Sequence, residues 1–89
     1  MTTYVKDPSA TLDYAFDWSS WLASGDSIAS ATVTADTGLT VASTSVSSSS
    51  VTAWLSGGEA GSLYRVVCQV TTEGGRTDER TMQIEVTQR

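Results

Sequence analysis

The chain has 89 residues, of which 39% are hydrophobic and 17% charged, with a formal net charge of -5 and no histidine. This length allows one domain with a small hydrophobic core. The five basic residues are scattered, which argues against a nucleic-acid partner because phosphate recognition needs clustered cations. The lack of histidine removes hydrolytic triads and most acid–base pairs, so neither an enzyme nor a cofactor is expected.

The cysteine content and the hydrophobic runs of the sequence indicate where in the cell the protein is made. Cys68 is the only cysteine, so no intramolecular disulfide can form and packing alone must hold the fold. The N-terminal sequence has neither the basic start nor the apolar run of a signal peptide, and no stretch approaches the roughly 20 apolar residues of a membrane span. We therefore expect synthesis in the cytoplasm and no membrane partner.

The first residues, 1 to about 8, are predicted to form an extended arm on a single domain that spans residues 1–89. Pro8 disfavours helix at Asp7 and cannot donate a hydrogen bond to a sheet. An arm contributes little to the core, so its removal is expected to leave thermal stability nearly unchanged.

The segment LDYAFDWSSWL begins with strict alternation. Leu12, Tyr14, Phe16 and Trp18 fall on one face of a predicted strand. The next residues break the alternation, and Trp21 is expected to fold back toward the core as a lid on one end of the domain.

Two β-leaning segments follow. In residues 28–35, Ala31 and Val33 are assigned to one face, and Ile28 shares the opposite, solvated face with Thr32. Residues 39–41 predict a further short strand. The Ser-rich stretch 43–51 is interpreted either as a flexible hairpin tip or as an edge strand.

The C-terminal half contains the clearest strands. Residues 51–55 resume the pattern, with Trp54 expected in the core beside Trp18 because a domain this small needs their buried area. A glycine-rich loop leads to residues 63–72, a predicted central strand with one buried face. After a hairpin turn, a last strand places its apolar residues inward. The inward residues of these two strands are Tyr64, Val66, Cys68 and Val70, then Met82, Ile84 and Val86.

The number and spacing of these segments indicate the fold class. About seven short strands, with turn signals every 8 to 12 residues, are typical of an all-β, immunoglobulin-like antiparallel β-sandwich. Cys68 lies on the inward face of its strand, which favours a buried, inert thiol over a nucleophile.

Two kinds of surface site can be weighed. Asp7, Asp13 and Asp17 are close in sequence, but their spacing is not that of a calcium loop, which favours an ordinary solvated face and no metal site. The hairpin around residues 74–80 forms either solvated cross-strand ion pairs or a contact with a partner. Exposed aromatics near an arm are typical of interaction hot spots. The candidate interface residues are Tyr4, Lys6, Asp7, Tyr14, Trp21, Arg76, Asp78 and Arg80.

Three ordered stretches resemble a known family. They are VKDPSATLDYAFDWSSWL, AWLSGGEAGSLYRV and TTEGGRTDERTMQIEV. Together they are similar to the fibre-tail adaptor proteins of tailed bacteriophages, over nearly the whole chain. The matching positions are Lys6, Asp7, Pro8, Leu12, Asp13, Tyr14, Asp17, Trp18, Trp21, Leu22, Trp54 to Gly58, Gly61, Tyr64, Gly75, Arg76, Asp78 and Arg80.

The resemblance implies a non-catalytic immunoglobulin-like protein of the virion, at the tail or head–tail junction. It also implies partners among other virion proteins, such as the tail fibre and a head–tail adaptor or portal-proximal protein, and multiple copies per particle. A capsid cement or decoration protein, bound to the major capsid protein, is the alternative. A carbohydrate-binding module that uses Trp21 and Tyr14 is a third class.

Overall fold

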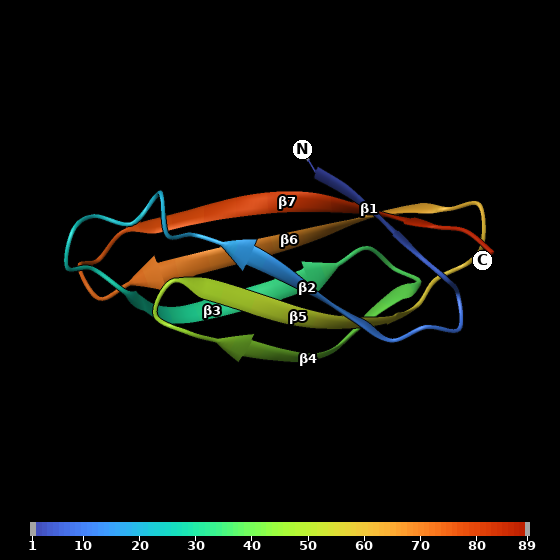
Figure 1. Cartoon of the computed structure of the whole chain (residues 1–89), viewed down its shortest axis with the longest axis horizontal. Helices are drawn as coiled ribbons and strands as arrows, with labels where there is room; N and C mark the ends of the chain where they lie inside the picture. The colour runs from blue at the N-terminus through green and yellow to red at the C-terminus, as the bar shows by residue number, and fades with distance from the viewer. Residues whose placement is uncertain (1, 89) are drawn as a thin grey trace.

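The chain folds into two packed β-sheets, as seen in a computed structural model that describes residues 2–88 (Figure 1). Within that range it forms seven strands and no helix, and hence no helix long and apolar enough to cross a membrane. The all-β prediction is confirmed. The strands are β1 (Thr2–Lys6), β2 (Leu12–Asp17), β3 (Ile28–Ala35), β4 (Leu39–Val46), β5 (Ser50–Gly57), β6 (Leu63–Thr72) and β7 (Thr77–Val86).

The strand order is that of an immunoglobulin-type sandwich. One sheet has the order β1-β7-β6-β3 and the other β2-β5-β4. All neighbours are antiparallel except β1, which runs parallel to β7. Strands β2, β5 and β4 correspond to strands B, E and D of a constant-type immunoglobulin domain, and β7, β6 and β3 to G, F and C. The first strand, β1, pairs with the second of these sheets instead of the first.

The core lies between the two sheets and follows the alternation of the strands. In β6 the inward residues Tyr64, Val66, Cys68 and Val70 are all buried, as the sequence predicted. The inward residues of β7 are buried as well, namely Met82, Ile84 and Val86. Trp18, directly after β2, has no exposed surface and is the largest fully buried side chain.

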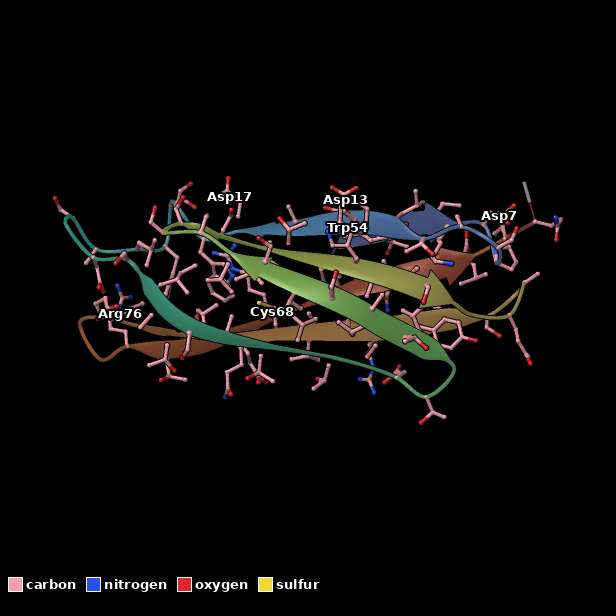
Figure 2. The ribbon with its side chains drawn as sticks, turned by 90° about the horizontal axis from the view of Figure 1, so that it is seen from below. Asp7, Asp13, Asp17, Trp54, Cys68 and Arg76 are labelled. Atoms are coloured by element: carbon pink, nitrogen blue, oxygen red, sulfur yellow. The ribbon has the colours of Figure 1, made fainter. Side chains whose placement is uncertain are left out.

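The prediction that Trp54 lies in the core is wrong. Trp54 is 40% exposed, on the outer face of β5 beside Asp13 of β2 (Figure 2). Its neighbours Ala53 and Leu55 are both fully buried. Because side chains alternate between the faces of a strand, residue 54 must face outward once these two face inward.

The face assigned to Ile28 is also wrong, because of a backbone irregularity. The pairing of β3 with β6 shifts register between Ile28 and Ser30. This shift lets Ile28 point into the core, and the regular strand beyond it still turns Ala31 and Val33 inward.

The Ser-rich stretch is divided between an edge strand and a hairpin turn: residues 43–46 belong to the edge strand β4, and residues 47–49 make the turn into β5. In the turn, the Ser47 hydroxyl lies 2.8 Å from that of Ser50 and accepts a hydrogen bond from the Ser50 amide at 3.1 Å. Serine hydroxyls therefore organise this hairpin locally.

The N-terminal segment is extended, as predicted, but it lies against the domain as β1 instead of projecting as an arm. Lys6 is fully buried, and its ammonium donates to the carbonyl oxygens of Asp7 at 2.8 Å and Gly57 at 2.7 Å. Tyr4 packs against Tyr14 with ring centroids 5.3 Å apart. These contacts make β1 part of the sheet and remove the basis for expecting that its loss is harmless.

Removal of residues 1–7 is expected to lower the free energy of unfolding by more than about 2 kcal/mol, since it deletes an edge strand together with a buried side chain. Urea denaturation measures this loss. As a control, Thr3→Ala removes only an exposed hydrogen bond to Gln83 and should change stability by less than about 0.5 kcal/mol. A truncated protein as stable as the full chain would contradict an integral role for β1.

Candidate interaction site

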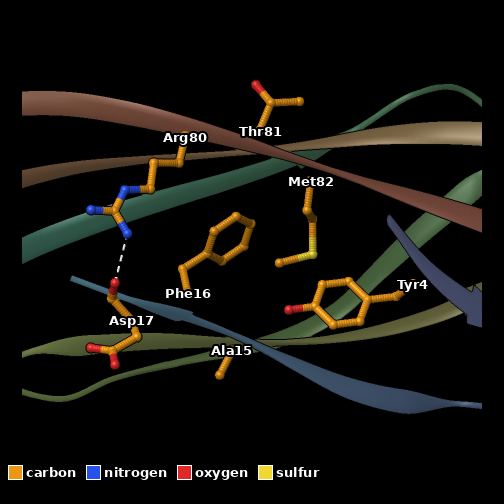
Figure 3. Close-up of a pocket in the computed structure, with 7 residues that line it drawn as sticks. All are labelled: Tyr4, Ala15, Phe16, Asp17, Arg80, Thr81 and Met82. Carbon is orange, nitrogen blue, oxygen red and sulfur yellow. Dashed lines mark hydrogen bonds between the residues drawn. The ribbon is translucent and has the colours of Figure 1, made fainter. Parts of the chain in front are cut away.

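A pocket opens along one long side of the sandwich, where β7 of one sheet approaches β2 of the other (Figure 3). Its volume is about 240 Å³. Phe16 and Met82 supply its apolar depth, and Tyr4 and Arg80 stand at its rim (Figure 3). The complete lining is Tyr4, Ala15, Phe16, Asp17, Arg80, Thr81 and Met82.

Two incompletely paired strands border this pocket. β1 pairs with β7 only from Met82 to Val86, so residues 77–81 have no partner strand on that edge within the described chain. β2 is likewise an edge strand, paired only with β5. Strand edges offer backbone donors and acceptors that an extended segment can bind, and the pocket between them can receive its apolar side chain. We call this region the lateral groove.

Beside the groove, four side chains from two distant segments interleave into what we call the arginine–tryptophan ladder: Arg80, Trp18, Trp21 and Arg76. The Arg80 guanidinium lies 4.3 Å from the Trp18 ring centroid, and that of Arg76 lies 4.4 Å from the Trp21 ring. The two indoles meet edge to face at 5.1 Å. Each cation thus sits over an aromatic face, where the ring quadrupole attracts it.

Backbone contacts fix the ladder. The amides of Trp21 and Leu22 donate to the Trp18 carbonyl at 3.0 and 3.1 Å, a tight turn that brings the second indole next to the first. Arg80 donates to the Asp17 carbonyl at 2.6 Å, and Arg76 to that of Trp21 at 3.3 Å. The prediction that Trp21 folds back toward the core is confirmed, since it packs half-buried against it.

Trp18 also meets Cys68 in the interior. Burial raises the pKa of the Cys68 thiol, and its interactions with Trp18 and Arg80 oppose that rise more weakly. The Trp18 Nε1 atom is buried without a hydrogen bond of normal geometry among the described residues, so the sulfur contact does not satisfy it fully. A thiol that is buried and protonated at neutral pH is not a nucleophile.

The structure separates the predicted interface residues into exposed and internal groups. Tyr4 and Arg80 border the groove, and Trp21 and Arg76 belong to the adjoining ladder. Asp78, between the two arginines in sequence, is exposed and accepts a hydrogen bond from the Glu79 amide at 2.8 Å.

The other predicted interface residues have roles inside the fold. Lys6 and Tyr14 are buried, so they cannot present a contact surface in this conformation. Asp7 is half-buried and accepts hydrogen bonds from the Ser9 amide at 2.9 Å and hydroxyl at 2.7 Å, which organise the turn into β2. It lies at the opposite end of the long axis from Arg76 (Figure 2).

Sequence reasoning missed part of the groove. Phe16 and Met82 were assigned to the core, correctly, but the pocket reaches them because the two sheets are open along this side. Asp17 was considered as a cation ligand or as a solvated carboxylate, whereas its backbone carbonyl anchors Arg80. The alternation of apolar and polar residues predicts to which face of a strand a side chain points. It does not predict where the two sheets separate and leave a pocket between them.

The aspartates considered for a cation do not gather into a site. Among the described residues, no group of three or more His, Cys, Asp or Glu side chains is placed to hold a metal ion. Asp17 instead accepts a hydrogen bond from the Ser19 amide at 2.9 Å. Hydrogen bonds from Ser19, aided by Arg80, lower the pKa of Asp17.

Asp26 ties the β2–β3 loop to the β6–β7 hairpin next to the ladder. Its carboxylate accepts hydrogen bonds from the amides of Ser27 at 2.9 Å and Gly74 at 3.0 Å. A hydrogen bond with the Thr72 side chain is the largest effect that lowers the pKa of Asp26. The loop that carries Trp21 is therefore fastened at both of its ends.

Fold and site together define a small immunoglobulin-like sandwich with an open groove bordered by strand edges. A comparison with protein families gives a match of residues 6–85 to the family described as podophage GP4 fiber-tail adaptor protein gp77. The chain belongs to this family, which supports a role as a phage tail adaptor, a virion tail location and contacts with other tail proteins. No curated protein matches the chain.

The ladder can be tested by replacing Arg80 with methionine, which keeps the apolar stem and removes the charge. We expect the free energy of unfolding to fall by about 1–3 kcal/mol, because a cation–aromatic contact and a charged hydrogen bond are both lost. Arg65→Met is the matched control, since the Arg65 side chain forms an exposed ion pair with Asp36 at 3.8 Å, which should contribute less than about 1 kcal/mol. Equal losses in the two variants would contradict the role of the ladder.

Asp26→Asn tests the loop anchor through pH. A pKa below the ordinary value of 3.8 in the folded state means that the charged form stabilises the fold above that value and that this stabilisation is lost as the pH falls below it. Thermal melting should find the variant less stable than the wild type above about pH 5, with the difference shrinking at lower pH. A difference that is constant with pH would assign the effect to something other than this carboxylate.

Proposed function

We propose that the chain is a non-enzymatic structural protein of a phage virion that connects tail fibres to the tail or head–tail connector. The observation that carries this proposal is the match to the fibre-tail adaptor family over residues 6–85. The fold supports it, because a sandwich with free strand edges and a groove between them suits protein contacts.

The lateral groove is the proposed docking site for one of the two partners. An extended segment of a fibre or connector protein would pair with the free edge of β7 at residues 77–81 or with β2. One apolar side chain of that segment would enter the pocket between Phe16 and Met82. Main-chain hydrogen bonds then supply affinity, and the pocket supplies specificity.

Charges at the rim can orient that segment. The backbone of Asp17 anchors the Arg80 guanidinium, while the Asp17 carboxylate points away from it (Figure 3). Arg76 follows along the same hairpin, over Trp21. Arg80 thus borders the groove and Arg76 lies in the adjoining ladder, in a protein of net charge -5. An acidic residue in the partner segment would complement them.

The available chemistry supports a binding role. The sequence contains no histidine, and its single cysteine is buried with a raised pKa. The abundant serines serve turns and surfaces, as at Ser47 and Ser50.

The proposal is tested first by imaging intact virions decorated with Fab fragments raised against this protein. Label at the tail or at the head–tail junction supports the adaptor role. Label over the capsid shell would replace it with the decoration-protein alternative, and absence of label on every particle would contradict a virion role.

Tyr4→Ala tests the groove itself in binding measurements with the purified fibre and connector proteins of the same phage. We expect roughly tenfold weaker binding to one of them, since exposed tyrosines at a docking site are frequent hot spots. Val46→Ala removes an apolar side chain of comparable exposure from β4, away from the groove, and should leave affinity unchanged. Thermal melting checks that both variants are folded. Equal affinities for Tyr4→Ala and wild type would exclude the groove as the docking site.

A further inference from the structure

The two long sides of the sandwich differ sharply in charge. Between residues 27 and 58, Asp36 is the only charged residue, and it lies in the turn from β3 to β4. β3 and β4, the edge strands of the side away from the lateral groove, therefore carry no charge at all (Figures 1 and 2). On the groove side, β2 contains Asp13 and Asp17, and the part of β7 that is not paired with β1 contains Asp78, Glu79 and Arg80.

An uncharged edge is unusual because natural sheets generally protect their edges. Charges, proline and bulges on an edge strand prevent it from pairing with another chain. Both strands contain a register shift, β4 between Val41 and Ser43 and β3 at its beginning, between Ile28 and Ser30. β3 pairs regularly with β6 from Ser30 to Ala35, and this run contains no charge, proline or glycine. Its outer edge has no partner strand in the described part of the chain.

Charge indicates which kind of chain would pair with the free edge of β3. A different protein can recognise an acidic chain through opposite charges, which favours the charged sides. A second copy carries the same net charge of -5 and is repelled wherever acidic groups face each other. Along the run from Ser30 to Ala35 of β3, two copies can pair without placing acidic groups opposite each other.

We propose that two copies of this chain associate by antiparallel pairing of their β3 edges, which joins two four-stranded sheets into one continuous sheet. This inference rests on charge and strand pairing and is independent of the proposed function. Residues paired in an antiparallel ladder lie on the same face of the sheet, which limits the possible registers. Two of the allowed registers place the middle of the run from Ser30 to Ala35 at the two-fold axis. Thr32 then lies opposite Thr32 or Thr34 of the second copy.

In both registers, the side chains on each face of the joined sheet meet compatible partners. Thr32 and Thr34 are exposed on the outer face, and threonine pairs across strands are favourable. Ala31, Val33 and Ala35 lie on the inner face, where they are only half-buried in the single copy. Pairing would remove more of their apolar surface from water.

The test is the oligomeric state of the purified protein, measured by sedimentation velocity over a range of concentrations. The wild type should form a dimer, and Thr32→Lys should weaken association at least about tenfold, since it places two cations across the new ladder. Gln69→Lys is the matched control. Gln69 is exposed and pairs with Thr32 from β6, so the same charge enters the same face one strand away from the edge.

A mixture of Thr32→Lys and Thr32→Glu distinguishes strand pairing from a general effect of charge. Mixing should restore association between the two variants, because opposite charges then face each other across the axis. A wild type that stays monomeric at its highest soluble concentration would overturn the proposal. Loss of association in Gln69→Lys equal to that in Thr32→Lys would overturn it as well, as would failure of the mixture to associate.

Discussion

The burial of Trp18 is the constraint on which the rest of this structure depends. The domain has no disulfide, and Trp18 is its largest fully buried side chain. Its backbone amide donates a hydrogen bond to the Ser49 carbonyl, and its own carbonyl accepts the hydrogen bonds of the turn that carries Trp21. Its ring lies beneath Arg80 of the opposite sheet. Trp18 thus links the end of β2 with the β4–β5 turn through its backbone and with β7 through its ring.

The residues that carry the family resemblance mostly hold the two ends of the sandwich. At one end, Lys6 bonds two backbone carbonyls and Asp7 organises the following turn. The Tyr64 hydroxyl accepts a hydrogen bond from the Glu59 amide at 3.0 Å, which resembles the tyrosine corner of immunoglobulin domains. At this corner Gly58 has a φ of +92°, and a side chain there would collide with Val86. The tryptophans and arginines of the ladder perform the same task at the other end. These motifs therefore describe how the fold is closed, and the proposed partner surfaces lie between them.

The contrast between the two long sides suggests a division of labour. The lateral groove offers short strand edges, an apolar pocket and charges, a combination that discriminates between different partners. The β3 side offers an uncharged edge that is regular from Ser30 to Ala35, which suits pairing with an identical chain.

The sequence by itself determined the fold class and most of the core, since period-two alternation in β2, β6 and β7 specifies which side chains meet between the sheets. It also predicted the inward turn of Trp21. It could not distinguish Trp18 from Trp54, because both lie in alternating apolar segments and only the pairing of β5 decides which face is inner. It missed the bulge that turns Ile28 inward and the docking of β1 on β7. The groove and the ladder likewise required the tertiary structure, because they join residues more than fifty positions apart, and local patterns contain no information about such distant contacts.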